Sequence, residues 1–149
     1  MRNRLNIVLV MLALTAGATT ASAQVAVIAH RDVPADSISK TDLLDFYTGD
    51  VQAWPDDHAV VVFDLKTRGP VRDAFYEYLG KTSSRMRSLW LKRKLSGEGD
   101  PPESFETETA LLEQVARTPG AIGFVQKANV SGDGVKILAE IEIEIDEGS

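Results

Sequence analysis

An unbroken apolar run followed at once by an amphipathic segment, residues 60–79 (VVVFDLKTRGPVRDAFYEYL), constrains the fold of this chain most. The run at residues 60–63 is β-branched and aromatic without alternation, which predicts a strand covered on both faces. Gly69 suits the N-cap of a following helix and Pro70 its first turn, where a missing N–H costs nothing. The apolar stripe of this helix comprises Val71, Phe75, Tyr78 and Leu79. A strand that feeds a helix in this way aims the helix N-terminus beyond the end of the strand, where anions bind.

The N-terminal residues have the pattern of a secretory signal. Arg2 and Arg4 precede an apolar run at residues 7–18, and Ala21-Ser22-Ala23 is a small-residue cleavage signature. Residues 1–23 are therefore predicted to be a signal peptide, with an uncleaved anchor as the alternative, although the run is short for a membrane span. We expect residues 24–149 to form one domain that is periplasmic or secreted, without stable membrane insertion after cleavage.

The composition excludes several classes of function. The chain has no cysteine, so disulfides, thiolate metal sites, a cysteine nucleophile and a lipid anchor on a lipobox cysteine are all excluded. Its net charge is −6, and removal of the two N-terminal arginines lowers it to −8. An acidic domain of this kind is unsuited to nonspecific nucleic-acid binding, which needs basic patches.

The rest of the chain alternates strand and helix signals. We expect a strand at residues 25–29, then a helix at 40–48 that begins after Ser39 and ends at Gly49. Ser83 or Ser84 caps another helix to about residue 95, with Met86, Leu89, Trp90 and possibly Arg93 on one stripe. A loop at residues 96–102, a helix at about 107–117 and a strand at 121–125 follow. This order predicts one α/β domain with a mixed β-sheet flanked by helices.

Residues 135–145 show the clearest period-two pattern of the chain. One predicted face carries Ile137, Ala139, Ile141, Ile143 and Ile145, and the other carries Lys136, Glu140, Glu142 and Glu144. The pattern predicts a half-buried strand at an edge of the sheet. Its acidic outer face is suited to preventing edge-to-edge aggregation.

Three phrases, in this order, resemble one known family. They are SISKTDLLDFYTGDVQAWPDD at residues 37–57, VVFDLKTRGPVRDAFYEYL at 61–79 and TPGAIGFV at 118–125. The chain resembles the PstS-type phosphate-binding proteins, the solute-binding components of ABC importers, and in particular their short homologues. The resemblance implies a single-lobe, periplasmic-binding-protein-like domain. Full-length members have two lobes that close over phosphate, and this chain has the length of about one, the second.

The phosphate motif of that family is altered here. The family has an Arg at the end of the central strand and a Ser-Gly-Thr run that opens the helix. Aligned on residues 72–75, these positions hold Asp64 or Leu65, and then Gly69, Pro70 and Val71. Two hydroxyl donors and one backbone amide are lost, each worth about 1–3 kcal/mol in an anion site. These losses argue against high-affinity phosphate binding of the family kind.

A different set of donors stands in the same loop. The candidate ligand-binding residues are Lys66, Thr67, Arg68 and Gly69, which offer two cations, a hydroxyl and a backbone amide to an anion. The alternative is an exposed turn with ordinary charges. The sequence favours this alternative, because no other residues are predicted to converge on the loop.

Other chemistry-bearing residues have plainer interpretations. A basic cluster comprises Lys81, Arg85, Arg87, Lys92, Arg93 and Lys94. It forms either a docking patch for an acidic partner or, as we favour, the solvated faces of a helix. His30 and His58 have no ligand partners at metal-site spacing, and no nucleophile-elbow motif is present, so we expect no metal, no cofactor and no enzyme activity.

The sequence thus predicts an exported, non-catalytic, solute-binding-like domain. Its expected ligand is phosphate or another oxyanion, and its expected partner is an ABC importer or another protein. The alternative is a half-length relic of the fold that has lost the ligand site and acts as a protein interaction module, for which strand pairing along residues 137–145 is one route.

Overall fold

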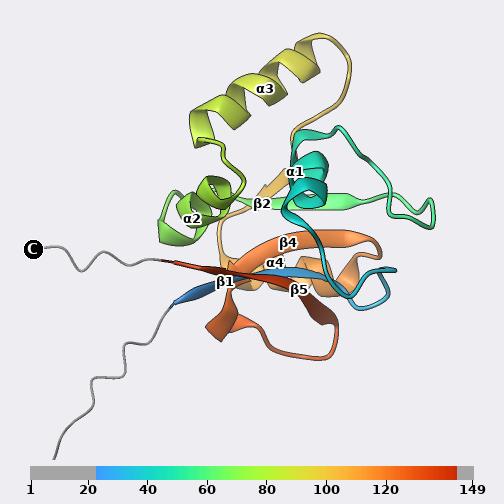
Figure 1. The fold of residues 1–149 in the computed structure, drawn as a ribbon, viewed down its shortest axis with the longest axis vertical. Coiled ribbons are helices and arrows are strands. Elements are labelled where there is room, and N and C mark those ends of the chain that lie inside the picture. The colour runs from blue at the N-terminus through green and yellow to red at the C-terminus, as the bar shows by residue number, and fades with distance from the viewer. Residues whose placement is uncertain (1–22, 144–149) are drawn as a thin grey trace, which may run out of the picture.

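Within residues 23–143, which the computed structural model describes, five strands form one mixed sheet in the order β3-β2-β4-β1-β5, flanked by four α-helices (Figure 1). The elements in chain order are β1 (Gln24–His30), α1 (Lys40–Thr48), β2 (Val61–Leu65), α2 (Pro70–Tyr78), α3 (Ser83–Leu95), β3 (Glu103–Phe105), α4 (Glu108–Arg117), β4 (Ala121–Gln126), the short 3-10 helix η1 (Lys127–Asn129) and β5 (Val135–Glu142). The predicted α/β class and mixed sheet are confirmed. The predicted signal peptide, except Ala23, and the predicted end of the last strand at Ile145 lie outside the described residues.

Four of the five strands of the sheet point in the same direction. β2 runs parallel to β3 and to β4, whereas β1 is antiparallel to β4 and to β5. The carboxyl ends of β2, β3, β4 and β5 therefore lie along the same side of the sheet. β4 is the middle strand of the sheet, and β2, which contains most of the apolar run at residues 60–63, lies between β4 and the edge strand β3.

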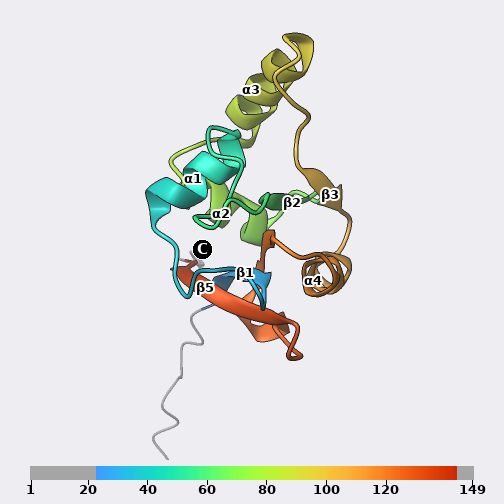
Figure 2. The same ribbon diagram turned by 90° about the vertical axis from the view of Figure 1, so that its right-hand side faces the viewer.

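Helices cover both faces of the sheet, and two successive residues of β4 show how α4 and α2 pack against opposite faces. Successive residues of a strand point to opposite faces. At Gly123 a Cβ atom would lie 2.7 Å from a Leu111 methyl of α4, so the glycine lets α4 approach this face closely. The next residue, Phe124, stacks on Phe75 of α2 with ring centroids 3.9 Å apart. Figure 2 shows α4 and α2 on opposite sides of the sheet.

Most helix boundaries match the predictions. Ser39 caps α1 by accepting a hydrogen bond from the Asp42 amide at 3.1 Å, and Gly49 ends the helix with φ of 78°. The predicted N-cap of α3, Ser83 or Ser84, is wrong. Thr82 is the N-cap, and its hydroxyl accepts a hydrogen bond from the Arg85 amide at 3.2 Å. In the part of the chain that the structure describes, no helix has the length and apolarity needed to cross a membrane.

The edge strand β5 departs from strict alternation. Val27 pairs with Ala139 but the next residue, Ile28, pairs with Ile137, so Leu138 is an extra residue in a bulge. The bulge shifts the alternation, so Leu138 is buried although the period-two pattern places it on the predicted polar face with Lys136 and Glu140. The predicted edge position of the strand is confirmed.

A short strand that the sequence does not predict closes the other edge. β3 follows the loop at residues 96–102 and pairs with β2, where Phe105 packs edge-on against Phe63 with ring centroids 5.1 Å apart. Three residues are too few to show a period-two pattern. β3 nevertheless matters for the site, because it fixes the loop that follows β2.

Candidate functional site

The loop that carries the four predicted ligand-binding residues joins the end of β2 to the start of α2. It lies at the edge of the sheet where β2, β3, β4 and β5 end. Lys66, Thr67 and Arg68 are exposed, and Gly69 is half-buried. Pro70 is the first residue of α2, as predicted. The predicted strand–loop–helix unit is therefore present, and its loop faces solvent.

Two donors of this loop are already used inside the protein. The Lys66 amide donates to the Phe105 carbonyl at 2.8 Å, and the Thr67 hydroxyl donates to the Glu106 carbonyl at 3.0 Å. Both bonds tie the loop to the end of β3. Thr67 thus holds the loop in place and does not offer its proton to a ligand.

The remaining donors of the loop are available. The amides of Thr67, Arg68 and Gly69 make no hydrogen bond to another described residue. Within residues 23–143, the side chains of Lys66 and Arg68 form no ion pair. Two exposed cations and three adjacent amides without a partner among the described residues therefore lie at a helix N-terminus, an arrangement that can receive an oxyanion.

Asp64, the carboxylate at or beside the family's arginine position, is buried in an internal cluster. Its side chain accepts hydrogen bonds from the Tyr76 hydroxyl at 2.6 Å and from the Leu65 amide at 2.8 Å. The Arg72 guanidinium pairs with the same carboxylate at 3.4 Å. The negative charge of Asp64 is therefore compensated inside the protein, which weakens its repulsion of an anion at the loop.

Arg72 connects three elements, a role that the sequence did not indicate. Besides Asp64 at the end of β2, it donates to the Ser83 hydroxyl at the start of α3 at 2.7 Å. Its guanidinium also lies over the Tyr76 ring, 4.8 Å from the centroid. The one available signal was an aspartate directly after an apolar run, since a buried carboxylate requires a partner.

Burial and the Asp64 carboxylate raise the pKa values of two tyrosines in and beside this cluster. Burial raises the pKa of Tyr76, and the charge of Asp64 raises it further. The pKa of Tyr47 is raised by burial first and then by Asp64 and Tyr76. The Tyr47 hydroxyl donates to the Phe63 carbonyl at 2.8 Å. Both hydroxyls are thus structural donors that retain their protons at neutral pH.

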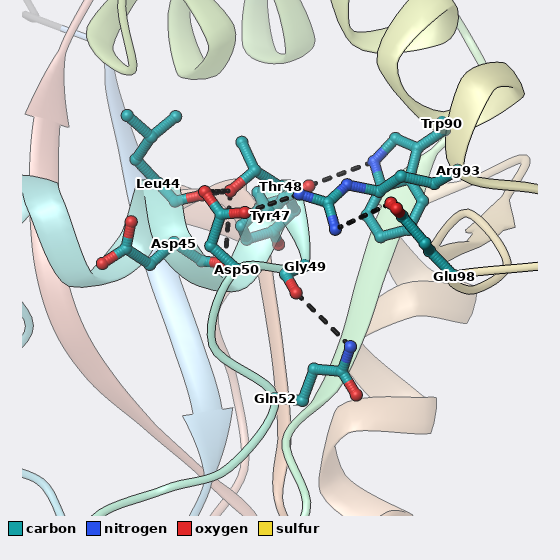
Figure 3. A network of polar contacts seen from close by, with 10 residues as sticks. All are labelled: Leu44, Asp45, Tyr47, Thr48, Gly49, Asp50, Gln52, Trp90, Arg93 and Glu98. Atoms are coloured by element: carbon teal, nitrogen blue, oxygen red, sulfur yellow. Dashed lines mark hydrogen bonds and ion pairs between the residues drawn. The ribbon is translucent and has the colours of Figure 1, made fainter. Parts of the chain in front are cut away.

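Two side chains of α3 attach this helix to α1 and to the turn that follows it (Figure 3). The Trp90 indole N–H donates to the Tyr47 carbonyl at 3.1 Å. Arg93 pairs with Asp50 at 2.5 Å and with Glu98 at 3.8 Å. Arg93 therefore belongs to an attachment network and not to an exposed basic patch. The other five cations of the basic cluster form no ion pair with a described residue.

The two histidines lie apart in the fold. The His30 side chain is buried and its Nδ1 accepts from the Asp32 amide at 3.1 Å. His58 lies in an exposed turn, with its Nδ1 2.8 Å from the Asp56 carboxylate. In the described part of the chain, no group of three or more histidine or acidic side chains is arranged to hold a metal ion.

The fold matches solved structures of phosphate-binding proteins. A candidate phosphate ABC transporter substrate-binding protein from Clostridium perfringens, solved with bound phosphate, aligns with a TM-score of 0.64 at 21% identity over 78% of this chain and 44% of its own. An ABC-type phosphate transport receptor from Vibrio cholerae aligns with a TM-score of 0.63 at 14% identity over 81% of this chain and 55% of its own. PstS from Borrelia burgdorferi aligns with a TM-score of 0.57 at 15% identity over 78% of this chain and 47% of its own.

This chain has the fold of about half of such a protein. The similarity to PstS-type proteins expected from the three sequence phrases is therefore confirmed at the level of the fold. At these identities the comparison shows the fold alone. No protein-family model matches the sequence, and a comparison with curated proteins finds no match.

Proposed function

We propose that this chain is exported and binds phosphate or a similar oxyanion, without catalysis, at the loop formed by Lys66, Thr67, Arg68 and Gly69. One observation carries the proposal: two cations and three amides that have no ion pair or hydrogen bond with a described residue lie together at the N-terminus of α2. The fold that presents them resembles 44% of the length of a protein solved with bound phosphate, which supports the proposal.

Each part of the loop has a distinct role in this proposal. Lys66 and Arg68 supply positive charge, and Arg68 can donate two parallel hydrogen bonds to two oxygens. The amides of residues 67–69 donate to the remaining oxygens, and the helix dipole adds partial positive charge. Thr67 holds the loop against Glu106. Because the hydroxyl donors and the strand-end arginine of the family are absent, we expect weaker binding than in the family.

The physiological setting follows from the same proposal. The predicted signal peptide at residues 1–23 would deliver the domain of residues 24–149 to the periplasm or the exterior. There it would present phosphate or a related oxyanion to an ABC importer or to another protein partner.

The test is a thermal-unfolding titration of the purified protein with phosphate, sulfate, arsenate and molybdate at constant ionic strength. A ligand at one hundred times its Kd adds about 2.7 kcal/mol, which raises the midpoint of a domain of this size by several degrees. Arg68→Ala should lower the affinity for the oxyanion that stabilises the wild type about tenfold, because a charge-assisted contact is removed.

Arg85→Ala is the matched control for that variant, because it removes one exposed arginine from α3 and leaves the loop intact. The control should retain the wild-type response. Equal responses of Arg68→Ala and the wild type would remove the loop from the binding site.

A second candidate function, a protein interaction module, is favoured by one observation. Leu91 and Leu95 of α3 are 57% and 80% exposed. The same helix carries Arg87, Lys92 and Lys94, which form no ion pair with a described residue. This combination is suited to an acidic partner with apolar side chains. A folded protein that responds to none of the four oxyanions would favour this function over the first.

A further inference from the structure

A cavity of about 290 Å³ lies between α3 and the carboxyl-terminal parts of β2 and β3. Asp64 and Ser104 are register partners on these two parallel strands, so their side chains share one face of the sheet and line the cavity together. Arg72, from α2, lines it as well. The cavity is separate from the four loop residues proposed above, since none of them lines it.

Helix α3 covers this cavity with a single face. The residues of α3 that line it are Ser83, Met86, Arg87, Trp90, Leu91 and Lys94. They recur every three or four positions, which is one stripe of a helix. Of this stripe, Met86 alone is fully buried. Figures 1 and 2 both show α3 standing away from the sheet. Of the residues predicted to be core, Met86 and Trp90 thus face a partly open space.

The lining of the cavity is positively charged although the protein is acidic. Arg72, Arg87 and Lys94 stand against the single carboxylate of Asp64, while the whole chain carries −6. Asp64 already accepts from Tyr76 and pairs with Arg72. Arg87 and Lys94 have no ion pair with a described residue, and the buried Nε of Arg72 has no hydrogen-bond partner there. These groups favour an anion.

The walls of the cavity are largely apolar, which selects the kind of anion. Met86, Trp90 and Leu91 lie on one side, and Pro101 and Pro102 lie on another. Such walls cannot satisfy the oxygens on all sides of an inorganic phosphate ion. They suit a ligand with a flat or branched apolar body, and the volume is near the lower end, about 300 Å³, of typical small-molecule sites.

From this geometry we propose that the cavity binds a small organic anion. Its carboxylate or sulfonate group contacts Arg87 and Lys94 at the rim, and its apolar body packs against Met86 and Trp90. The proposal concerns a second site and stands independently of oxyanion binding at the loop.

The test uses the fluorescence of anilinonaphthalene sulfonate, an aromatic anion, with the purified full chain at fixed ionic strength. Wild-type protein should give a saturable fluorescence rise that phenylacetate reverses and that inorganic phosphate does not. The double variant Arg87→Ala/Lys94→Ala should bind the probe at least about tenfold more weakly, because two charged contacts are lost.

Arg85→Ala/Lys92→Ala is the control, since it removes the same charge from exposed positions of α3 that do not line the cavity. It should bind the probe as the wild type does. Equal loss in both double variants, unchanged binding in Arg87→Ala/Lys94→Ala, or displacement of the probe by phosphate would each overturn the proposal. Arg68→Ala should leave probe binding intact, which separates this site from the loop.

Discussion

At the scale of single residues, the stability of this fold depends on the pairing of the buried Asp64 carboxylate. Only 10% of its side chain and 14% of the Arg72 side chain are exposed, so neither charge can be satisfied by water alone. Breaking such a pair by removing one partner leaves the other buried and uncompensated.

We expect Asp64→Asn to destabilise the protein by about 3 kcal/mol, since it leaves the Arg72 guanidinium without its counter-charge. Urea unfolding measures the difference. Asp133→Asn, the same change at an exposed loop position, should stay within about 0.5 kcal/mol of the wild type. Equal stability of the two variants would show that the pair contributes little.

Tyr76 should make stability depend on alkaline pH. Burial raises its pKa in the folded state above the ordinary value of 10.0, with a further rise from Asp64. Above about pH 10 the unfolded chain releases this proton and the folded chain keeps it, so stability falls as pH rises. Tyr76→Phe should reduce the fall by up to about 1.4 kcal/mol per pH unit, as measured by urea unfolding between about pH 9 and 11. Parallel pH profiles would contradict this assignment.

At the scale of elements, the placement of α3 depends on close contact between Trp90 and Gly49. Gly49 has φ of 78°, and a Cβ atom there would lie 2.8 Å from the Trp90 ring. The ring also donates to the Tyr47 carbonyl, so it cannot move away without losing a hydrogen bond. The C-cap of α1 and the attachment of α3 are therefore one structural feature.

Gly49→Ala should be more destabilising than Gly80→Ala by about 1–3 kcal/mol, the usual cost of overpacking. Gly80 is a matched control because its φ is 72° and its surroundings are open, so the backbone strain is similar and the collision is absent. Thermal unfolding and tryptophan fluorescence measure the two effects. Equal destabilisation of the two variants would mean that the Trp90 ring moves away from the added methyl group without loss of stability.

Local signals in the sequence predicted the elements well, and non-local contacts account for the errors. The cap of α1 at Ser39 and its end at Gly49 depend on residues within one turn, and both were correct. The bulge at Leu138 depends on pairing with β1, and β3 depends on pairing with β2. Neither partner can be read from the sequence of the strand itself.

At the scale of the whole molecule, the three sequence phrases predicted the fold, and the comparisons with solved structures confirm it. The candidate loop is one continuous segment, so its place at the start of α2 was predictable. The cluster of Asp64, Arg72 and Ser83 joins three elements, and the cavity beneath α3 depends on where that helix lies. The sequence could not predict either one, because both arise from tertiary packing.

We propose that the loop between β2 and α2 receives an oxyanion, and this is the claim to test first. The most direct measurement is a phosphate titration followed by the backbone amide resonances in NMR, at constant ionic strength. We expect saturable shifts that are largest at Thr67, Arg68 and Gly69, whose amides make no hydrogen bond to another described residue. In Arg68→Ala the same shifts should require a higher phosphate concentration. Unmoved resonances at these three amides, or saturable shifts confined to another part of the protein, would contradict the claim.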